Sequence, residues 1–256
     1  MYREFKKEDF QREFNLKKDY NVFGFLVYGT YKDYYYEMLK ESLERLGYKA
    51  KFQRPSHDFL APILEFKVNG KNFWFVKAYG GALLCEWLHL ACLFGSQKNI
   101  VIGSCGGLFE QANARDIIIP QYSFANESTT RAYELNTDNK HYADNDLRKE
   151  LIKIMNKKYK VLEGPTITNE AMLAETKEDI LKWSSEGYYG VEMEAATVFA
   201  VSKHFKVPSA AILMIVDNLI KEETVLDSNH GNSRDLRLQV SADMFDAALE
   251  TMLITR

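Results

Sequence analysis

Three short runs of almost continuously apolar residues constrain the fold of this chain most. They span residues 99–103, 116–120 and 210–217 and consist mainly of Ile, Val, Leu, Met and Ala. Two further β-rich runs, 23–28 and 73–78, precede them. A strand without a polar face has to be covered on both sides, as the strands of parallel sheets are. These runs therefore predict a central sheet buried between two layers.

Helical patterns fill the intervals between the runs. Leu147, Leu151, Ile154 and Met155 have the spacing of an amphipathic helix. The segments with helical character are 33–46, 82–94, 144–158, 176–186, 193–205 and 234–253. Strands that alternate with helices indicate an α/β fold. We expect a three-layer sandwich, with a central mixed β-sheet flanked by helices, formed by one domain over residues 21–256. The charged residues 1–20 are expected to lie outside that core as an extension.

Charge, hydropathy and cysteine content exclude several function classes. A net charge of −3 and a pI near 6.0 argue against general binding to nucleic acid. No apolar run approaches the roughly 18 residues of a membrane span, and the charged N-terminus lacks the apolar core of a signal peptide. Three unevenly spaced cysteines argue against a disulfide framework. We therefore expect a cytoplasmic protein, with a small molecule rather than nucleic acid or a membrane as its partner.

The carboxyl ends of the predicted strands are the places where ligands gather in such sheets. One of these ends carries Gly103-Ser104-Cys105-Gly106-Gly107. We expect a loop here, whose backbone N–H groups and Ser104 hydroxyl suit an anion or a sugar oxygen. A tight turn that serves only to connect two strands fits the pattern equally well.

The same glycines also have the form of a cysteine nucleophile elbow around Cys105. Such an elbow holds its thiol at the N-terminus of a helix that follows directly. Only residues 108–115 precede the next predicted strand, which is too short for that helix. Cys105 is therefore expected to be a packing residue. A Cys105-dependent amide hydrolase remains an alternative, with a base among the histidines His57, His89, His141, His204 and His230.

Residues 191–196, Val-Glu-Met-Glu-Ala-Ala, carry two glutamates into an otherwise apolar run. Residues two apart lie about 200° apart around a helix, so Glu192 and Glu194 cannot both serve one site if both are helical. A carboxylate near a helix N-terminus is stabilised there without any ligand. If it is buried, however, it needs hydrogen-bond donors, which two sugar hydroxyls would supply. Asp217, at the end of its apolar strand, fits either a turn residue or a general acid with a raised pKa.

Together these residues resemble one enzyme family. Gly29, the glycine segment, the motif at 191–196 and Asp217 occur in the order found in the nucleoside phosphorylase family. That family includes hexameric purine nucleoside phosphorylases, uridine phosphorylases and methylthioadenosine nucleosidases. The resemblance covers about residues 20 to 250, so residues 21–256 are expected to form one nucleoside phosphorylase-like domain.

The resemblance implies a role for each matching residue. Glu194 would bind the ribose 2′- and 3′-hydroxyls, and Met193 would pack on the sugar. Glu192 would point elsewhere or play a secondary part. Asp217 would protonate N7 of a departing purine, and uridine enzymes of the family generally lack this aspartate. Thr168 and Met172 would line the base pocket. Gly29 and Ser104 would lie on the side of the attacking nucleophile. The family needs no metal or other cofactor, only inorganic phosphate as co-substrate.

The chain departs from the family at the phosphate site. Phosphorylases of the family use arginines there, and at two of those positions this chain has Asp33 and Val101. Because guanidinium groups match phosphate geometry, their loss matters. Other basic residues could take over their role, namely Lys32, Arg54, Lys77, Arg115 or Arg131. Nucleosidases of the family instead position water with a glutamate in the early loop, and Asp33 falls near that position.

We therefore expect an enzyme that cleaves the N-glycosidic bond of a purine nucleoside and transfers the ribosyl group to phosphate. A nucleosidase that uses water, and a module that binds nucleosides without turnover, remain alternatives. The family resemblance further implies a homo-oligomer, either a dimer or a hexamer.

Overall fold

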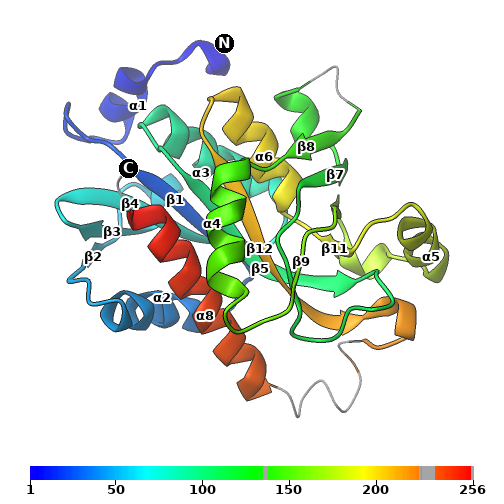
Figure 1. Ribbon diagram of the computed structural model, residues 1–256. Helices are drawn as coiled ribbons and strands as arrows, with labels where there is room; N and C mark the ends of the chain where they lie inside the picture. The colour runs from blue at the N-terminus through cyan, green and yellow to red at the C-terminus, as the bar shows by residue number, and fades with distance from the viewer. Residues whose placement is uncertain (135–137, 225, 227–233, 255–256) are drawn as a thin grey trace.

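The computed structural model describes residues 1–134, 138–224, 226 and 234–254. Within these residues one twelve-stranded mixed sheet runs through the molecule in the order β2-β3-β4-β1-β5-β11-β10-β7-β8, and β12, β6 and β9 branch from β5 (Figure 1). The strands are β1 (Gly24–Gly29), β2 (Lys51–Gln53), β3 (Leu64–Val68), β4 (Lys71–Ala78), β5 (Asn99–Gly107), β6 (Ile117–Ile118), β7 (Tyr122–Asn126), β8 (Lys140–Tyr142), β9 (Val161–Leu162), β10 (Thr166–Asn169), β11 (Gly190–Glu192) and β12 (Ser209–Asn218).

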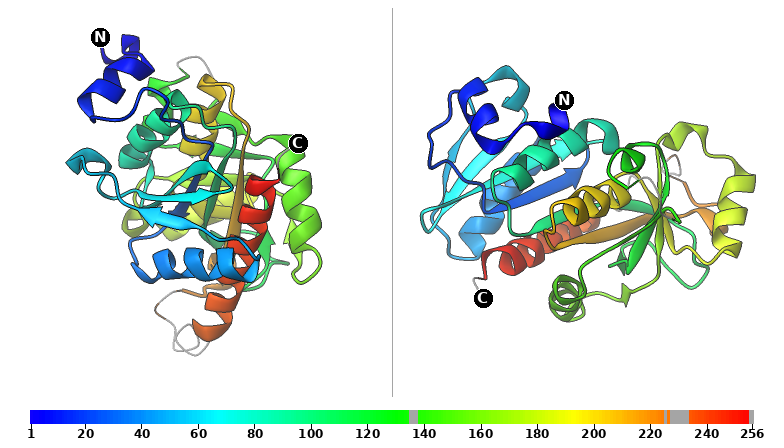
Figure 2. Two further views of the ribbon diagram at one scale, coloured as in Figure 1. Left: turned by 90° about the vertical axis from the view of Figure 1, so that its left-hand side faces the viewer. Right: turned by 90° about the horizontal axis from the view of Figure 1, so that it is seen from above.

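Helices cover both faces of this sheet, which confirms the predicted three-layer α/β sandwich (Figures 1 and 2). One face packs against α3 (Gly81–Leu93) and α6 (Ala195–His204). The other packs against α2 (Tyr34–Arg45), α4 (Asn145–Met155) and α8 (Arg234–Leu253). A smaller cluster lies under α5 (Lys177–Ser185). Strands β1, β4, β5 and β12 carry four of the five predicted runs and pair in parallel at the centre of the sheet. The fifth run, 116–120, forms β6, which pairs antiparallel with β12.

The glycine segment is not the loop that we expected. Residues Gly103 to Gly107 continue β5, which pairs in parallel with β12 and, at Gly106 and Gly107, antiparallel with β11. The segment remains part of the strand because β12 on one side and β11 on the other pair with its backbone hydrogen-bonding groups. A Cβ on Gly107 would lie 3.1 Å from Ile215 and 3.2 Å from the Asp217 carbonyl oxygen, so glycine allows this close pairing.

Residues 1–20 do not stay outside the core. Phe10 and Phe14 project from the same side of α1 (Lys7–Glu13) and its C-cap, and Phe14 is 6% exposed within the cluster that contains α3. The Trp74 indole N–H donates to the Tyr20 hydroxyl at 2.8 Å. The expectation was wrong because it rested on the charged residues of this segment, whereas its aromatic residues determine how the segment packs. These aromatic side chains attach α1 to the domain.

None of the helices in the described part of the chain is both long and apolar enough to cross a membrane.

Candidate active site

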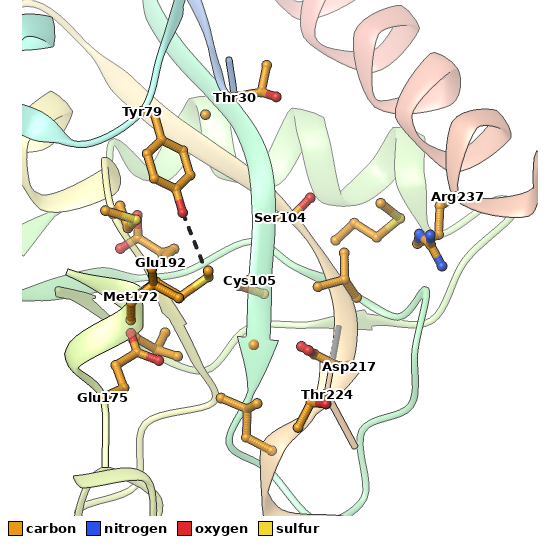
Figure 3. A pocket seen from close by; sticks show the side chains of 18 of the residues that line it. Thr30, Tyr79, Ser104, Cys105, Met172, Glu175, Glu192, Asp217, Thr224 and Arg237 are labelled. Carbon is orange, nitrogen blue, oxygen red and sulfur yellow. Dashed lines mark hydrogen bonds between the residues drawn. The ribbon is translucent and has the colours of Figure 1, made fainter. Parts of the chain in front are cut away.

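A cavity of about 950 Å³ opens at the carboxyl ends of β1, β5, β11 and β12. Of the residues expected at a nucleoside site, it brings together Gly29, Ser104, Met172, Met193, Glu194 and Asp217. Two others, Thr168 and Asp33, are not among the lining residues. Met172 lies in the short helix η4 (Met172–Ala174), and the Tyr79 hydroxyl donates to its sulfur at 3.7 Å (Figure 3).

Glu194 is the N-cap residue of α6 and is 4% exposed. Its Oε1 accepts a hydrogen bond from the Gly80 backbone N–H at 2.7 Å. Burial, followed by the charge of Glu192, raises the pKa of Glu194 to about 8. Donors from a ligand would stabilise the carboxylate form, because they replace the water that burial has removed.

Gly29 makes room for this carboxyl group. A Cβ on Gly29 would lie 2.5 Å from Oε2 of Glu194 and 3.0 Å from its Cδ. The glycine at the end of β1 is therefore required by the close approach of Glu194, in addition to any contact with a nucleophile.

The Gly29→Ala variant should displace the Glu194 carboxyl group and lower the affinity for ribonucleosides. A shift of this kind at a site of fixed geometry costs on the order of 10- to 100-fold in kcat/KM. Steady-state kinetics on adenosine or inosine would measure it. The matched control is Gly103→Ala in β5, whose Cβ would make only an ordinary 3.4 Å contact with Leu213. Equal kinetics for the two variants would contradict the role of Gly29.

Glu192 and Thr168 form a buried network under the N-terminus of α6. Oε2 of Glu192 accepts hydrogen bonds from the backbone N–H groups of Glu194 at 2.8 Å and Ala195 at 2.6 Å. Oε1 accepts from Ser123 at 2.9 Å and from the Thr168 hydroxyl, and Thr168 in turn accepts from the Ala196 N–H at 2.9 Å. Thr168 is fully buried and does not line the base pocket, contrary to the expectation. Its hydroxyl holds Glu192, and Glu192 holds the turn that carries Glu194.

Asp217 lies near the end of β12 and is 6% exposed. A bulge between Ile215 and Asp217 shifts the register, so that Asp217 pairs with Gly106 of β5. Bulges of this kind re-aim side chains near functional sites. Figure 3 shows Asp217 in the pocket, on the side where Arg237 extends from α8. Asp217 is thus a carboxyl group at the strand end with a cation on the same wall.

The sequence did not reveal the part played by the N-terminal turn of α8. Arg234 and Arg237, three residues apart, both line the cavity. Burial lowers the pKa of Arg237, while interactions with Tyr34, Tyr35 and Asp217 act in the opposite direction. The only sequence signal was two arginines with helical spacing after the Asp217 strand, and it became meaningful once α8 was seen beside β12.

Hydroxyl groups and cations gather in one part of the cavity, where Tyr34 interacts electrostatically with Lys32 and Arg234, and Arg237 interacts with Tyr34 and Tyr35. Tyr34, Tyr35 and Lys32 line it together with Arg234 and Arg237. The rings of Tyr34 and Tyr35 lie 4.3 Å apart. Burial raises the pKa of Tyr34 to about 12, so its hydroxyl is a neutral donor at physiological pH. This part of the cavity is suited to an anion.

The other basic residues considered from the sequence do not line the cavity. Lys77 pairs with Asp33, whose side chain is 91% exposed, and Asp33 therefore lies outside the cavity. Arg54 packs over the Tyr36 ring at 4.6 Å and donates to backbone carbonyls. Arg115 influences Arg237 electrostatically, and Arg131 belongs to the short helix Thr129–Ala132. Lys32 is the candidate from the sequence that lines the cavity.

Cys105 lines the cavity but is poorly suited to be a nucleophile. Burial, with the charges of Glu192 and Asp217, raises the pKa of its thiol well above the usual value. No helix follows it, because β5 continues to Gly107. His57, His89, His141 and His204 contact residues elsewhere in the fold, and His230 lies outside the described residues. Nothing in the described part of the chain therefore activates the thiol.

The model of the phosphorylase superfamily matches residues 82–250. The chain belongs to this superfamily. A DeoD-type purine nucleoside phosphorylase of Clostridium novyi is 28% identical over 131 residues, which are 51% of this chain and 56% of that protein. One from Clostridium beijerinckii is 26% identical over 160 residues, covering 62% and 65%. The chain thus spans less than two thirds of the length of these relatives.

Solved structures of the superfamily share the fold over nearly the whole chain. The uridine phosphorylase from Vibrio fischeri ES114 superposes with a TM-score of 0.72 at 18% identity and covers 93% of both chains. The same enzyme in complex with 6-hydroxy-1-naphthoic acid superposes with a TM-score of 0.75 and covers 95% of this chain. The family resemblance and the fold expected from the sequence are both confirmed.

Proposed function

We propose that this protein cleaves the N-glycosidic bond of a purine nucleoside and transfers the ribosyl group to inorganic phosphate. The observation that carries the proposal is the placing of Glu194 and Asp217 in one cavity, with Ser104, Lys32, Arg234 and Arg237 beside them. The purine relatives of the chain, and the aspartate at the end of β12, support a purine rather than a pyrimidine base.

In the proposed reaction, Glu194 accepts hydrogen bonds from the ribose hydroxyls while Met193 packs on the sugar. The bond between the anomeric carbon and N9 breaks, and its electrons pass to the base. Asp217 gives its proton to N7, which neutralises the leaving group. The anionic Glu194 favours the positive charge that develops on the ribose. A phosphate oxygen then bonds to the anomeric carbon, and Asp217 recovers a proton from solvent.

Phosphate is favoured over water as the nucleophile by the position of the charged side chains. Asp33, the residue that would have positioned water, lies outside the cavity in an ion pair with Lys77. Lys32, Arg234, Arg237 and the hydroxyls of Tyr34 and Ser104 line the cavity, where they supply donors for an anion. Hydrolysis by a nucleosidase is the alternative outcome of the test below.

Incubation of the protein with adenosine and inosine, with and without inorganic phosphate, tests this function. We expect free base and ribose 1-phosphate to form only when phosphate is present, as followed by chromatography. Free base without phosphate would identify a nucleosidase. If no nucleoside is cleaved under either condition, across a panel of nucleosides, the proposed reaction is wrong and a module that binds nucleosides without turnover is favoured.

A further inference from the structure

The proposed reaction gives no role to Tyr28, a buried tyrosine near the end of β1. It comes directly before Gly29, is 1% exposed and is not among the residues that line the cavity. In the sheet Tyr28 pairs with Ile102 of β5, and both pack in the hydrophobic cluster against α8. Because side chains two apart on a strand share a face, Ser104 points to the same face as Ile102. Figure 3 shows Ser104 on the side of β5 where Arg237 extends from α8, so Tyr28 lies behind the Ser104 side chain.

Other hydroxyl groups surround the hydroxyl of Tyr28. It lies 2.9 Å from Oγ of Ser241, a residue of α8 that is 1% exposed. The Tyr35 ring stacks on the Tyr28 ring at 3.8 Å, and Tyr35 lines the cavity. Burial raises the pKa of Tyr28 to about 12. Hydrogen bonds with Ser241, Tyr35 and Ser104 oppose this rise. Tyr28 is therefore a neutral hydroxyl at physiological pH, and it contacts Ser104 from the protein interior.

The number of donors and acceptors fixes how this group can be arranged. A hydroxyl has one proton to donate and can accept two hydrogen bonds. Tyr28 can accept from Ser241 and Tyr35, which leaves its own proton for Ser104. Ser104 then accepts from the interior and has its O–H free to donate into the cavity. Since hydrogen bonds in such a chain polarise and strengthen one another, the Ser104 hydroxyl becomes a donor of fixed direction.

The outer part of the same group of hydroxyls lies among cations. Tyr34 and Tyr35 follow each other at the start of α2, and both line the cavity with their rings 4.3 Å apart. Burial raises the pKa of Tyr34, and the positive charges of Lys32 and Arg234 oppose the rise. Donors beside positive charge favour an anionic ligand in this part of the cavity.

We propose that Tyr28 is a positioning residue that orients the Ser104 hydroxyl as a hydrogen-bond donor to the phosphate nucleophile. Tyr28 itself does not touch the ligand, and its effect passes through Ser104. The inference rests on the proposed function, because it places inorganic phosphate in this cavity.

Steady-state kinetics with varied phosphate at saturating inosine tests the role of Tyr28. The Tyr28→Phe variant removes the hydroxyl and keeps the ring that stacks on Tyr35 and Phe245. We expect kcat/KM for phosphate to fall about 10-fold, the upper end of the range for one hydrogen bond. The KM for inosine should change by less than about twofold, because the lost hydrogen bond does not reach the sugar or the base.

A double-mutant cycle separates positioning of Ser104 from a general structural effect. In the Ser104→Ala background, Tyr28→Phe should change kcat/KM for phosphate by less than about twofold, since the group through which it acts is gone. An equal loss with and without the Ser104 hydroxyl would assign Tyr28 a structural role and overturn the inference. Tyr28→Phe also leaves the buried Ser241 hydroxyl without its partner at 2.9 Å. The variant Tyr28→Phe/Ser241→Ala removes both hydroxyls, and it should show the same loss and the same cycle if the single variant fails to fold.

Tyr36→Phe is the matched control on α2. Its hydroxyl donates to the Pro62 carbonyl oxygen at 2.9 Å, and Tyr36 does not line the cavity. This variant should have the wild-type kcat/KM for phosphate. An unchanged value in Tyr28→Phe as well would refute the inference and leave the proposed function intact.

The wild type decides the proposed function separately from these variants. If phosphate takes no part in the reaction, the proposed function fails. The dissociation constant of inorganic phosphate, from isothermal titration calorimetry, then decides the inference by the same comparison of variants. Absence of phosphate binding to the wild type would contradict both.

Discussion

The Asp217→Asn variant is expected to lose purine nucleoside cleavage by about 10²- to 10⁴-fold in kcat, the usual contribution of a general acid. Asparagine has nearly the same shape and can still hydrogen-bond N7, but it cannot transfer a proton. Asp217 is 6% exposed and is set opposite Gly106 by the bulge in β12, so its geometry should survive the change. Release of free base, followed by ultraviolet absorbance, measures the effect.

A nucleoside whose purine is methylated at N7 provides the matched substrate control for Asp217. Its base already carries the positive charge that protonation would supply, so it departs without help from an acid. We expect Asp217→Asn to cleave this substrate at a rate close to that of the wild type. Near wild-type rates on unmodified adenosine or inosine would remove Asp217 from the mechanism. A large loss on both kinds of substrate would assign it a role in binding.

The Glu194→Gln variant is expected to lose on the order of 100-fold in kcat/KM, because a charged acceptor for two ribose hydroxyls is replaced by a neutral amide. The loss should vanish for a 2′,3′-dideoxynucleoside, which has no hydroxyls for Glu194 to bind. An unchanged kcat/KM on ribonucleosides would contradict the sugar-binding role.

The pH dependence gives a second measure of Glu194. Its pKa of about 8 means that the protonated form is the major one at pH 7. Since the anion accepts from the ribose hydroxyls, kcat/KM of the wild type should rise with pH towards about 8 and then level off. The Glu194→Gln variant should lack this rise. A rise that persists in the variant would assign it to another group.

The raised pKa of Glu194 also affects the stability of the empty protein. A carboxyl group whose folded pKa lies above its unfolded value binds its proton more tightly in the native state. The contribution of that proton is present at low pH and is lost as pH rises from the unfolded value of 4.5 through about 8. Binding of a sugar to the Glu194 anion would offset this loss of stability.

The secondary structure of the central layers was accessible from the sequence because it depends on local patterns. The apolar run at 210–217 and the helix at 234–253 correspond closely to β12 and α8. Short strands such as β7, β10 and β11 were not predicted, since three to five residues with polar side chains carry little periodic signal. Their hydrogen bonds depend on neighbours far away in the chain, and those neighbours also convert Gly103–Gly107 from an expected loop into strand.

The residues of the candidate site were likewise only partly predictable from the sequence. Glu194, Met193, Ser104, Gly29, Met172 and Asp217 were selected from the sequence, and the fold brings them into one cavity. Asp33 was misplaced because its side chain turns outward to Lys77, a residue on β4 that lies beside β1 only in the folded sheet. Arg237 was missed because its only sequence signal, an arginine three residues before it, becomes meaningful only when α8 is seen beside β12.

What the sequence by itself determined is therefore the layered α/β fold and the family, since both rest on local apolar periodicity and on short motifs. Tertiary structure alone decided which charges face the cavity. A single charged residue gives no sequence pattern that indicates whether its side chain points into a cavity or into solvent. Its neighbours in space depend on how distant strands and helices pack together. Helix α8 packs beside β12, and this packing brings Arg237 into the cavity with Asp217.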